Sequence, residues 1–258
     1  MITSVQNPKI QWVRSLQADS RARRQEKTFV VEGVRLIEEA ITAGWEARLV
    51  LHTEDLSERG LAVLKGYAAQ GAPLEQITSQ VMRSASDTET PQGILAVLAW
   101  RSLPLPAPLD FVLIPDTVRD PGNLGAMLRA AASAGVQAAF IPPETVDAFS
   151  PKVLRAGMGA HFRLPIRSTK WEEIVALVEP LKVFLPAAGE GVIYTGADFR
   201  VPLALIVGGE AEGASPQAQR LATRRVHIPM PGGGESLNAA VATGVLLFEV
   251  VRQRSDTS

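Results

Sequence analysis

Three segments of the chain carry residue types that bind and react with polar ligands, and each directly follows a short apolar run. They are residues 115–131, 208–215 and 229–240. Ligands of open parallel sheets bind at the carboxyl ends of the strands, so polar residues that directly follow strands are candidates for a site. These segments are therefore where the sequence predicts chemistry.

The first segment combines a helix start with two polar side chains. Asp120 is placed to cap a helix whose first residue is Pro121, and an alanine-rich run extends that helix. Asn123 and Arg129 are six residues apart, so a regular helix does not place them on one face. We expect Asn123 to organise the loop, and Arg129 to meet an anion or a partner surface. A surface salt bridge is an equal alternative for Arg129.

The second segment is an apolar run that leads into Gly208, Gly209 and Glu210. Glycine has no side chain, so a ligand can approach the backbone closely there. A simple turn is the alternative, and it would be favoured if the segment stood alone. The segment lacks the Gly-Lys-Ser/Thr ending of a Walker loop.

The third segment places Gly232–Gly234 between a strand-like run and a helix-like run. Three consecutive glycines are costly to order unless something binds there. Ser236 is placed as the N-cap of the helix, and Asn238 in its first turn can hydrogen-bond back to a loop. The sequence therefore predicts that this loop clamps a ligand.

Short continuous apolar runs predict the strands that position the three segments. The runs are 111–114, 138–141, 183–185, 203–207 and 226–228. Uninterrupted hydrophobicity is typical of strands buried on both faces, so we expect a mostly parallel sheet flanked by helices.

The first hundred residues predict a separate small α/β domain. Strand-like runs occur at 29–31, 48–51, 74–77 and 93–99, and a helical stretch occupies 34–43. Prolines then fill every second position of 103–108, which favours an extended linker. We expect domains at 1–100 and 110–258, joined by a linker at 101–109.

Composition excludes several classes of protein. The 258 residues include no cysteine, which excludes disulfides, Cys-ligated zinc, iron–sulfur clusters and a thiol nucleophile. No apolar stretch approaches the roughly 20 residues that span a bilayer, and no signal peptide is evident, so we expect a cytoplasmic protein. His52, His161 and His227 lack metal-ligand spacing. We therefore expect no metal, and structural or exposed roles for these histidines.

The net charge of −1 gives no global argument for nucleic acid, but residues 1–35 contain seven basic and three acidic residues. This excess predicts a phosphate-binding surface. The alternative is the solvated face of a helix. The candidate side chains are Arg21, Arg23, Arg24, Lys27 and Arg35.

Taken together, the motifs resemble three ordered signatures of the SpoU, or TrmH, family of RNA ribose 2′-O-methyltransferases. They are Asp120-Pro-Gly-Asn-Leu-Gly-x-x-x-Arg129, Gly208-Gly-Glu210-x-x-Gly213 and Ile228-Pro-Met-x-Gly232-x-x-x-Ser236-Leu-Asn238. Residues 150–165 also resemble the family. Asn7-Pro8, Phe29-Val-Val-Glu-Gly33 and Gly93 resemble the family's L30e-like substrate-binding domain.

The resemblance implies a C-terminal trefoil knot, a homodimer formed through it, and S-adenosylmethionine as cofactor. The implied cofactor-binding residues are Gly208, Gly209, Ile228, Met230 and Leu237. The implied catalytic residues are Asn123, Arg129, Glu210, Ser236 and Asn238. The basic N-terminal side chains would bind RNA, with ribosomal RNA expected rather than transfer RNA.

The implied reaction aligns a sulfonium methyl group with a ribose 2′-hydroxyl. A guanidinium stays protonated to about pH 12 and offers only donors. We therefore expect Arg129 to stabilise the developing alkoxide and to fix the adjacent phosphate, while the proton leaves to a phosphate oxygen, water or Glu210.

Three alternatives remain. A transfer-RNA 2′-O-methyltransferase shares all the motifs above. A nicotinamide-dependent oxidoreductase also uses glycine loops, but the chain lacks a Gly-x-Gly-x-x-Gly opening followed by an acidic residue about 20 positions later. An RNA-binding homologue without activity would not need the five polar residues that the chain retains.

Overall fold

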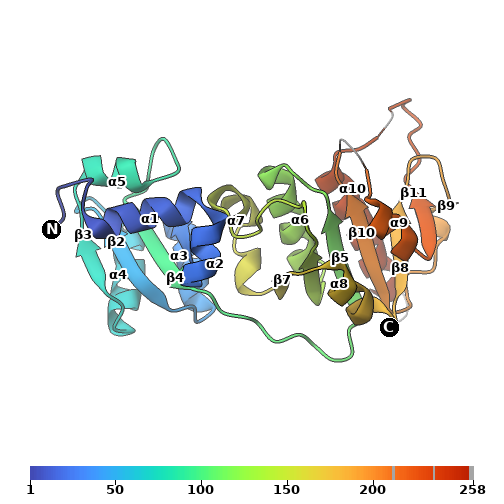
Figure 1. The fold of residues 1–258 in the computed structure, drawn as a ribbon, viewed down its shortest axis with the longest axis horizontal. Coiled ribbons are helices and arrows are strands. Elements are labelled where there is room, and N and C mark those ends of the chain that lie inside the picture. Colours follow the sequence, from blue (N-terminus) through green and yellow to red (C-terminus); the bar gives the residue numbers. More distant parts are fainter. Residues whose placement is uncertain (211–212, 235, 256–258) are drawn as a thin grey trace. The chain divides into compact units, whose positions relative to one another are not determined.

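The computed structural model describes residues 1–210, 213–234 and 236–255, which form two compact units (Figure 1). Unit 1 consists of Met1–Arg101 and Phe149–Phe162. Unit 2 consists of Ser102–Ala148 and Arg163–Ser258. Both units are α/β, as expected from the sequence.

Unit 1 is built on a sheet that has the order β1-β4-β2-β3 among the described residues. β4 is antiparallel to β1 and β2, and β3 is parallel to β2. The strands are β1 (Thr28–Glu32), β2 (Ala47–His52), β3 (Leu74–Gln76) and β4 (Ile94–Ala99). The helices are α1 (Pro8–Ala18), α2 (Ser20–Glu26), α3 (Val34–Thr42), α4 (Glu58–Ala69), α5 (Ser79–Ala85) and α7 (Pro151–Gly157), and a 3₁₀ helix covers Ala160–Phe162.

The core of unit 1 explains why α1 forms where it does. Asn7 caps the helix by accepting a hydrogen bond from Lys9 N at 2.9 Å. Ile10, Val13 and Leu16 recur every three residues and are fully buried in the core cluster, together with residues of the sheet. Apolar residues at this spacing form one face of a helix, so α1 is stabilised by covering the sheet.

Segment 149–162 belongs to unit 1 because its aromatic rings complete a cluster there. The ring of Phe149 lies 5.1 Å from that of Phe29 and 4.2 Å from that of Trp100. The Phe162 ring lies 5.5 Å from that of Trp45. The expected domain limits of 1–100 and 110–258 differ from the compact units at this segment. Residues 100–110 contain no strand or helix, as the alternating prolines predict.

Unit 2 contains a sheet that has the order β7-β6-β5-β10-β8-β11-β9 among the described residues, and every pairing in it is parallel. The strands are β5 (Phe111–Asp116), β6 (Ala138–Ile141), β7 (Ile166–Ser168), β8 (Lys182–Pro186), β9 (Val192–Ile193), β10 (Leu203–Gly208) and β11 (Arg224–His227). The helices are α6 (Pro121–Ser133), α8 (Trp171–Val178), α9 (Pro216–Leu221) and α10 (Ala239–Ser255), with a 3₁₀ helix at Tyr194–Gly196. The expectation of a parallel sheet is confirmed.

The strand order brings two of the chemistry-bearing segments together. β5 and β10 are neighbours in register, with Asp116 opposite Gly208 at their carboxyl ends. Asp120 caps α6 by accepting a hydrogen bond from Asn123 N at 2.8 Å, and Pro121 is its first residue, as expected. The third segment follows β11 and leads into α10. No helix within the described ranges is both long and apolar enough to cross a membrane.

Candidate active site

The loops that follow β5 and β10 are tied together by Thr117. Its hydroxyl donates a hydrogen bond to Gly213 O at 2.9 Å and accepts one from Gly209 N at 3.3 Å. One side chain therefore fixes the first segment against the second at the edge of the sheet.

Gly208 and Gly209 are required by the turns of the chain itself. A Cβ atom on Gly208 would lie 2.5 Å from Ala214 N, and one on Gly209 would lie 2.3 Å from Thr117 O. From the sequence, we expected glycine here so that a ligand could approach the backbone. The structure shows that a side chain at either position would clash with the backbone of the chain itself. By contrast, a Cβ atom on any residue of Gly232–Gly234 would meet no described atom within 4 Å.

A cavity of about 520 Å³ lies between the ends of β8, β10 and β11 and the start of α10. All five residues expected to bind the cofactor line it: Gly208, Gly209, Ile228, Met230 and Leu237. Val207 and Ala242 add apolar surface, and Glu210 and Ser236 also line the cavity. A concave volume of this size, lined by both apolar and polar groups, is typical of a small-molecule site.

A polar cluster at one edge of the cavity joins the three segments. Glu210 Oε1 accepts hydrogen bonds from Asn123 Nδ2 at 2.9 Å, from Asn238 Nδ2 at 2.6 Å and from Ala239 N at 3.3 Å. Asn238 Nδ2 also lies 3.0 Å from Asn123 Oδ1. The sequence placed these three side chains in the site, and the structure brings them within hydrogen-bond distance of one another.

The polar cluster also borders a second, smaller hollow of about 120 Å³, formed in part by Thr117, Asp120 and Asn123. Gly209, Glu210 and Ala239 line both spaces. The Glu210 carboxylate therefore stands between the larger cavity and the hollow.

The helix α10 is capped by Asn238 and not by Ser236, which corrects the expectation from sequence. Asn238 Oδ1 accepts hydrogen bonds from Ala240 N at 3.0 Å and from Val241 N at 3.2 Å. The helix begins at Ala239, so Ser236 lies too early to cap it. The same Asn238 side chain thus caps the helix with its oxygen and reaches Glu210 with its nitrogen.

Arg129 does not line either space in this chain. It is exposed on α6, and its guanidinium has no hydrogen bond or ion pair with any described residue. The expectation that Asn123 and Arg129 act separately is consistent with this placement, because Asn123 alone joins the polar cluster.

Two residues of this region were not expected from the sequence. Asp116 is completely buried; its Oδ2 accepts a hydrogen bond from Ser215 N at 2.6 Å, while its Oδ1 has no partner among the described residues. Burial raises the pKa of the Asp116 carboxyl, and the hydrogen bond from Ser215 opposes this. His227 lines the cavity with a buried, unpartnered Nδ1 in the described part of the chain. Their positions at strand ends were the available signal.

The expected basic surface in unit 1 is divided. Arg23 is 3% exposed, and its Nη1 donates hydrogen bonds to the Leu16 and Gln17 carbonyls at 2.6 and 3.0 Å. It therefore supports the end of α1 and is not available to RNA, which corrects the sequence interpretation.

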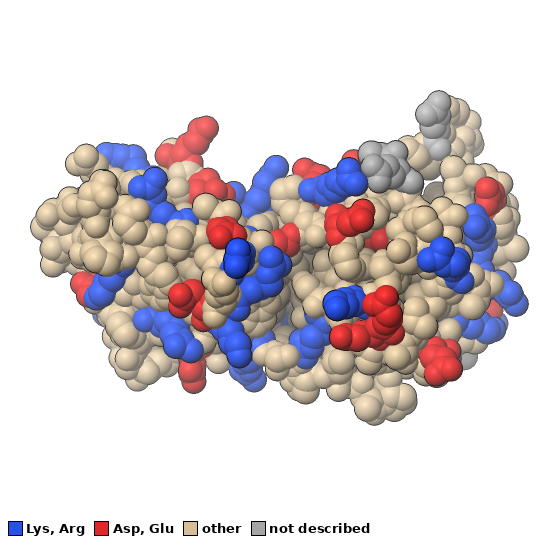
Figure 2. Space-filling view, viewed as in Figure 1, with Lys and Arg blue, Asp and Glu red and all other residues tan. Residues whose placement is uncertain are grey.

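The other basic side chains of this surface are exposed: Arg21, Arg24, Lys27 and Arg35. On the face drawn in Figure 2, basic and acidic side chains are interspersed. This face therefore has no broad positive surface, and an anion would have to be bound by individual basic side chains.

Comparisons with known proteins match both parts of the chain. A family model described as SpoU rRNA Methylase family matches residues 110–248, and one described as MRM3-like substrate binding domain matches residues 7–96. The 23S rRNA (guanosine(2553)-2′-O)-methyltransferase RlmP of Bacillus subtilis (strain 168) is 31% identical and is covered over 98% of its length by 96% of this chain. The human mitochondrial rRNA methyltransferase 3 is 32% identical, covering 90% of this chain and 69% of that protein. The SpoU methyltransferase AviRb of Streptomyces viridochromogenes, solved in complex with AdoMet, superimposes with a TM-score of 0.85 at 27% identity, covering 97% of this chain and 100% of that chain.

Proposed function

The chain belongs to the SpoU rRNA Methylase family, and on that premise we propose that it methylates a ribose 2′-hydroxyl of ribosomal RNA with S-adenosylmethionine. The observation that carries this proposal is the cavity of about 520 Å³ with the Asn123, Glu210 and Asn238 cluster at its edge. The relatives named as 2′-O-methyltransferases favour ribosomal over transfer RNA. The expected cytoplasmic location stays a prediction.

The residues of the cavity fit an adenosyl cofactor. Val207, Ile228 and Leu237 provide apolar surface for a flat base, and the glycine turns present main-chain donors and acceptors. The buried Nδ1 of His227 has no partner among the described residues, and a polar ligand atom would satisfy it. S-adenosylmethionine supplies an electrophilic methyl group on a sulfonium centre. Positioning that group and the acceptor together can lower the barrier by as much as about 7–11 kcal/mol.

Glu210 is the residue placed to receive the acceptor. Its Oε1 is held by three donors, so the side chain has little freedom to rotate away. Its Oε2 accepts no hydrogen bond from a described residue and can accept one from a ribose hydroxyl. We assign the departing proton to this oxygen, to water or to a substrate phosphate.

Arg129 completes the site from a second copy of the chain in this proposal. α6 packs against α10, and Val241 and Phe248 on α10 are 51% and 50% exposed. These two side chains are seven residues apart and therefore lie on one face of the helix. An exposed apolar stripe supports a homodimer through α10. The trefoil knot stays a prediction from the family resemblance. We assign Arg129 to the partner's cavity because it is exposed on α6 and lines neither space of its own chain.

Transfer of radiolabelled methyl groups tests the proposal. The purified protein is incubated with methyl-labelled S-adenosylmethionine and unmodified transcripts of 16S rRNA, 23S rRNA or transfer RNA. We expect label in ribosomal RNA only, at a ribose that becomes resistant to alkaline cleavage on its 3′ side. Label in transfer RNA alone would support the alternative substrate. Binding of the cofactor without methyl transfer to any RNA would contradict the proposed methyltransferase activity.

A further inference from the structure

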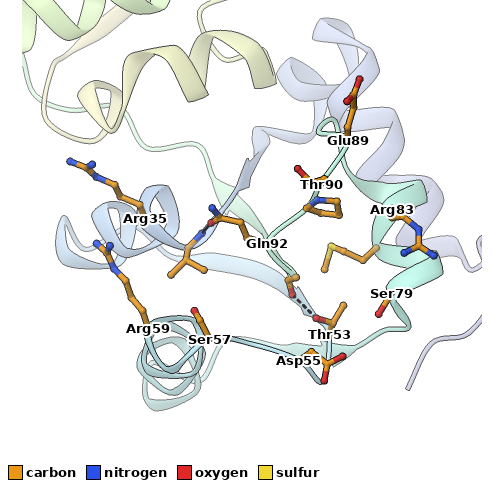
Figure 3. A pocket seen from close by; sticks show the side chains of 14 residues that line it. Arg35, Thr53, Asp55, Ser57, Arg59, Ser79, Arg83, Glu89, Thr90 and Gln92 are labelled. Atoms are coloured by element: carbon orange, nitrogen blue, oxygen red, sulfur yellow. Dashed lines mark hydrogen bonds between the residues drawn. The ribbon is translucent and has the colours of Figure 1, made fainter.

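Unit 1 contains a cavity that the reaction described above does not use (Figure 3). Its volume is about 900 Å³, and it lies among the starts of α3, α4 and α5 and the loop that precedes β4. The sequence analysis singled out Arg35 among its lining residues but did not predict the cavity, because the lining comes from four separate stretches of the chain. Its size lies within the range of about 300–1,000 Å³ that is typical of ligand sites.

Three arginines from three helices surround this cavity. Arg35 belongs to α3, Arg59 to α4 and Arg83 to α5. In Figure 3, Arg35 and Arg59 lie on one side and Arg83 lies on the other. Guanidinium groups recognise phosphate oxygens through paired hydrogen bonds, so the cavity has phosphate-binding groups on both sides.

The arginines differ in how they are held. Arg59 Nε donates to Glu38 Oε2 at 2.9 Å, and Glu38 raises the pKa of Arg59. Arg35 and Arg83 have no hydrogen bond or ion pair with a described residue, and both are exposed. These two guanidinium groups are therefore free to bind an anion. Asp55 and Glu89 also line the cavity, and Glu38, which holds Arg59, has its pKa lowered in part by the charge of Arg35. Cations and carboxylates are therefore balanced around the cavity, and the two arginines contribute through hydrogen-bond donors that no described residue uses.

The floor of the cavity is apolar and its wall is polar. Val34 and Met82 are 7% and 1% exposed, and Pro91 lies beside them in the lining. Gln92 Oε1 accepts a hydrogen bond from Val34 N at 2.9 Å, which fixes the amide and leaves its nitrogen to donate. A phosphate alone needs no such floor, whereas a base needs both an apolar surface and a hydrogen-bonding edge.

We propose that this cavity binds one unpaired nucleotide of the RNA substrate. Arg35 and Arg83 would contact the phosphates on either side of it, and the base would lie over the half-buried Pro91 with its edge toward Gln92. A concave site with cations on two sides admits a nucleotide that is turned out of a loop, but not the convex surface of a duplex. Sequence-specific RNA recognition favours such unpaired bases. This inference rests on the proposed function and gives unit 1 the task of selecting the substrate by its loop.

The test compares two double variants of the full chain in binding to labelled RNA. Arg35→Gln with Arg83→Gln removes the two free cations of the cavity. Arg48→Gln with Lys65→Gln removes the same charge from exposed positions of unit 1 that do not line it. The probes are a fluorescein-labelled single-stranded RNA of about 12 nucleotides, the same strand in a duplex, and free AMP and UMP as competitors.

We expect the cavity variant to weaken single-strand binding about tenfold and the control to change it less than twofold. Loss of two phosphate contacts should lower the slope of log K against log salt by about 1.4. Duplex affinity, S-adenosylmethionine affinity and the melting temperature should stay as in the wild type. Equal losses for both RNA probes would identify a general phosphate surface and overturn the inference. AMP or UMP binding that single-stranded RNA cannot displace would overturn it in favour of a free nucleotide.

Methyl transfer separates failure of this inference from failure of the proposed function. Suppose that the wild type methylates ribosomal RNA but the cavity variant binds single strands as tightly as the control variant does. This result would overturn the nucleotide site and leave the proposed function standing. A wild type that neither binds nor methylates RNA overturns both. Where the inference holds, the cavity variant should raise the KM for RNA about tenfold and leave kcat within twofold.

Discussion

The cavities of the two units are built in opposite ways. In unit 2, glycine turns, main-chain groups and three hydrogen-bonded polar side chains form a site from loops that follow parallel strands. In unit 1, the polar groups are arginines carried on three different helices around an apolar floor. The first construction suits a small cofactor that must be oriented precisely, and the second suits a charged, flexible polymer.

The difference also decides which site is visible in a sequence. Loop residues that serve one site lie close together along the chain, so their spacing forms a motif. Arginines on separate helices form no motif, because each one is also the ordinary solvated residue of its helix. Only the fold brings them around one cavity. The following predictions test this contrast, from the largest expected effect to the smallest.

Removal of the Arg129 guanidinium should have the largest effect. Arg129→Ala should lower the rate of methyl transfer about 10²–10³-fold, the loss typical of a group that stabilises developing negative charge. Arg129→Lys should recover little of it, because an ammonium lacks the planar fork. Single-turnover rates measure the loss, and Arg220→Ala on α9, also exposed, is the matched control. Near-normal turnover of the lysine variant would contradict this role.

Mixed dimers sharpen the assignment of Arg129 to the partner's site. Arg129→Ala and Asn238→Ala chains are each expected to be impaired, and they are purified together through two different tags. If Arg129 acts across the dimer, one site of each mixed dimer keeps both residues, and about half of the wild-type activity should return. If it acts within its own chain, every site lacks one residue and no activity should return.

Glycine substitutions should distinguish turns in which only glycine fits the backbone packing from turns in which a Cβ atom has space. Gly208→Ala places a Cβ atom 2.5 Å from Ala214 N. We therefore expect it to lower the free energy of unfolding by about 1–3 kcal/mol and to lower the melting temperature accordingly. Gly232→Ala meets no described atom within 4 Å and should change stability by less than about 0.5 kcal/mol. Thermal unfolding measures both. Equal destabilisation by the two variants would contradict the backbone-packing role of Gly208.

Two neighbouring arginines of unit 1 should differ in what they contribute to stability. Arg23→Ala removes hydrogen bonds to two carbonyls at the end of α1 and should cost about 1–3 kcal/mol of unfolding free energy. Arg24→Ala is exposed and should cost less than about 0.5 kcal/mol. Denaturant unfolding gives both values. An equally small loss for Arg23→Ala would contradict the structural role of the buried guanidinium.

The sequence predicted most of the fold of unit 2 because burial on both faces is recorded in continuous apolar runs. The run 138–141 coincides with β6 residue for residue. β9 was not predicted: Val192 and Ile193 form a strand of two residues and are 53% and 47% exposed, so no burial pattern marks them. The family expected from the three motifs is confirmed.

The sequence predicted part of the candidate site: it named three polar side chains that meet, but it did not name Asp116 or His227, and it named Arg129, which lines neither space. Asn123, Glu210 and Asn238 meet as expected, because each lies in a loop at the same edge of the sheet. Whether Ser236 or Asn238 caps α10 depends on the residue at which the helix begins. The glycine-rich segment before the helix does not define that residue in the sequence. Arg23 was misassigned because a run of charges does not show which side of a short helix faces the core.

The smallest expected effect concerns Asp116, which is buried under the turn that leads to α9. Because burial raises the pKa of this carboxyl, the folded protein holds the proton more tightly than the unfolded chain does. The contribution of Asp116 to stability is therefore greatest at low pH and decreases as pH rises from about 4 through the raised pKa. Asp116→Asn keeps an oxygen for Ser215 N and cannot ionise, so wild type should lose stability relative to this variant as pH rises. Melting temperatures of both proteins between pH 4 and pH 8 measure the difference, and a constant gap would mean that Asp116 titrates as it does in the unfolded chain.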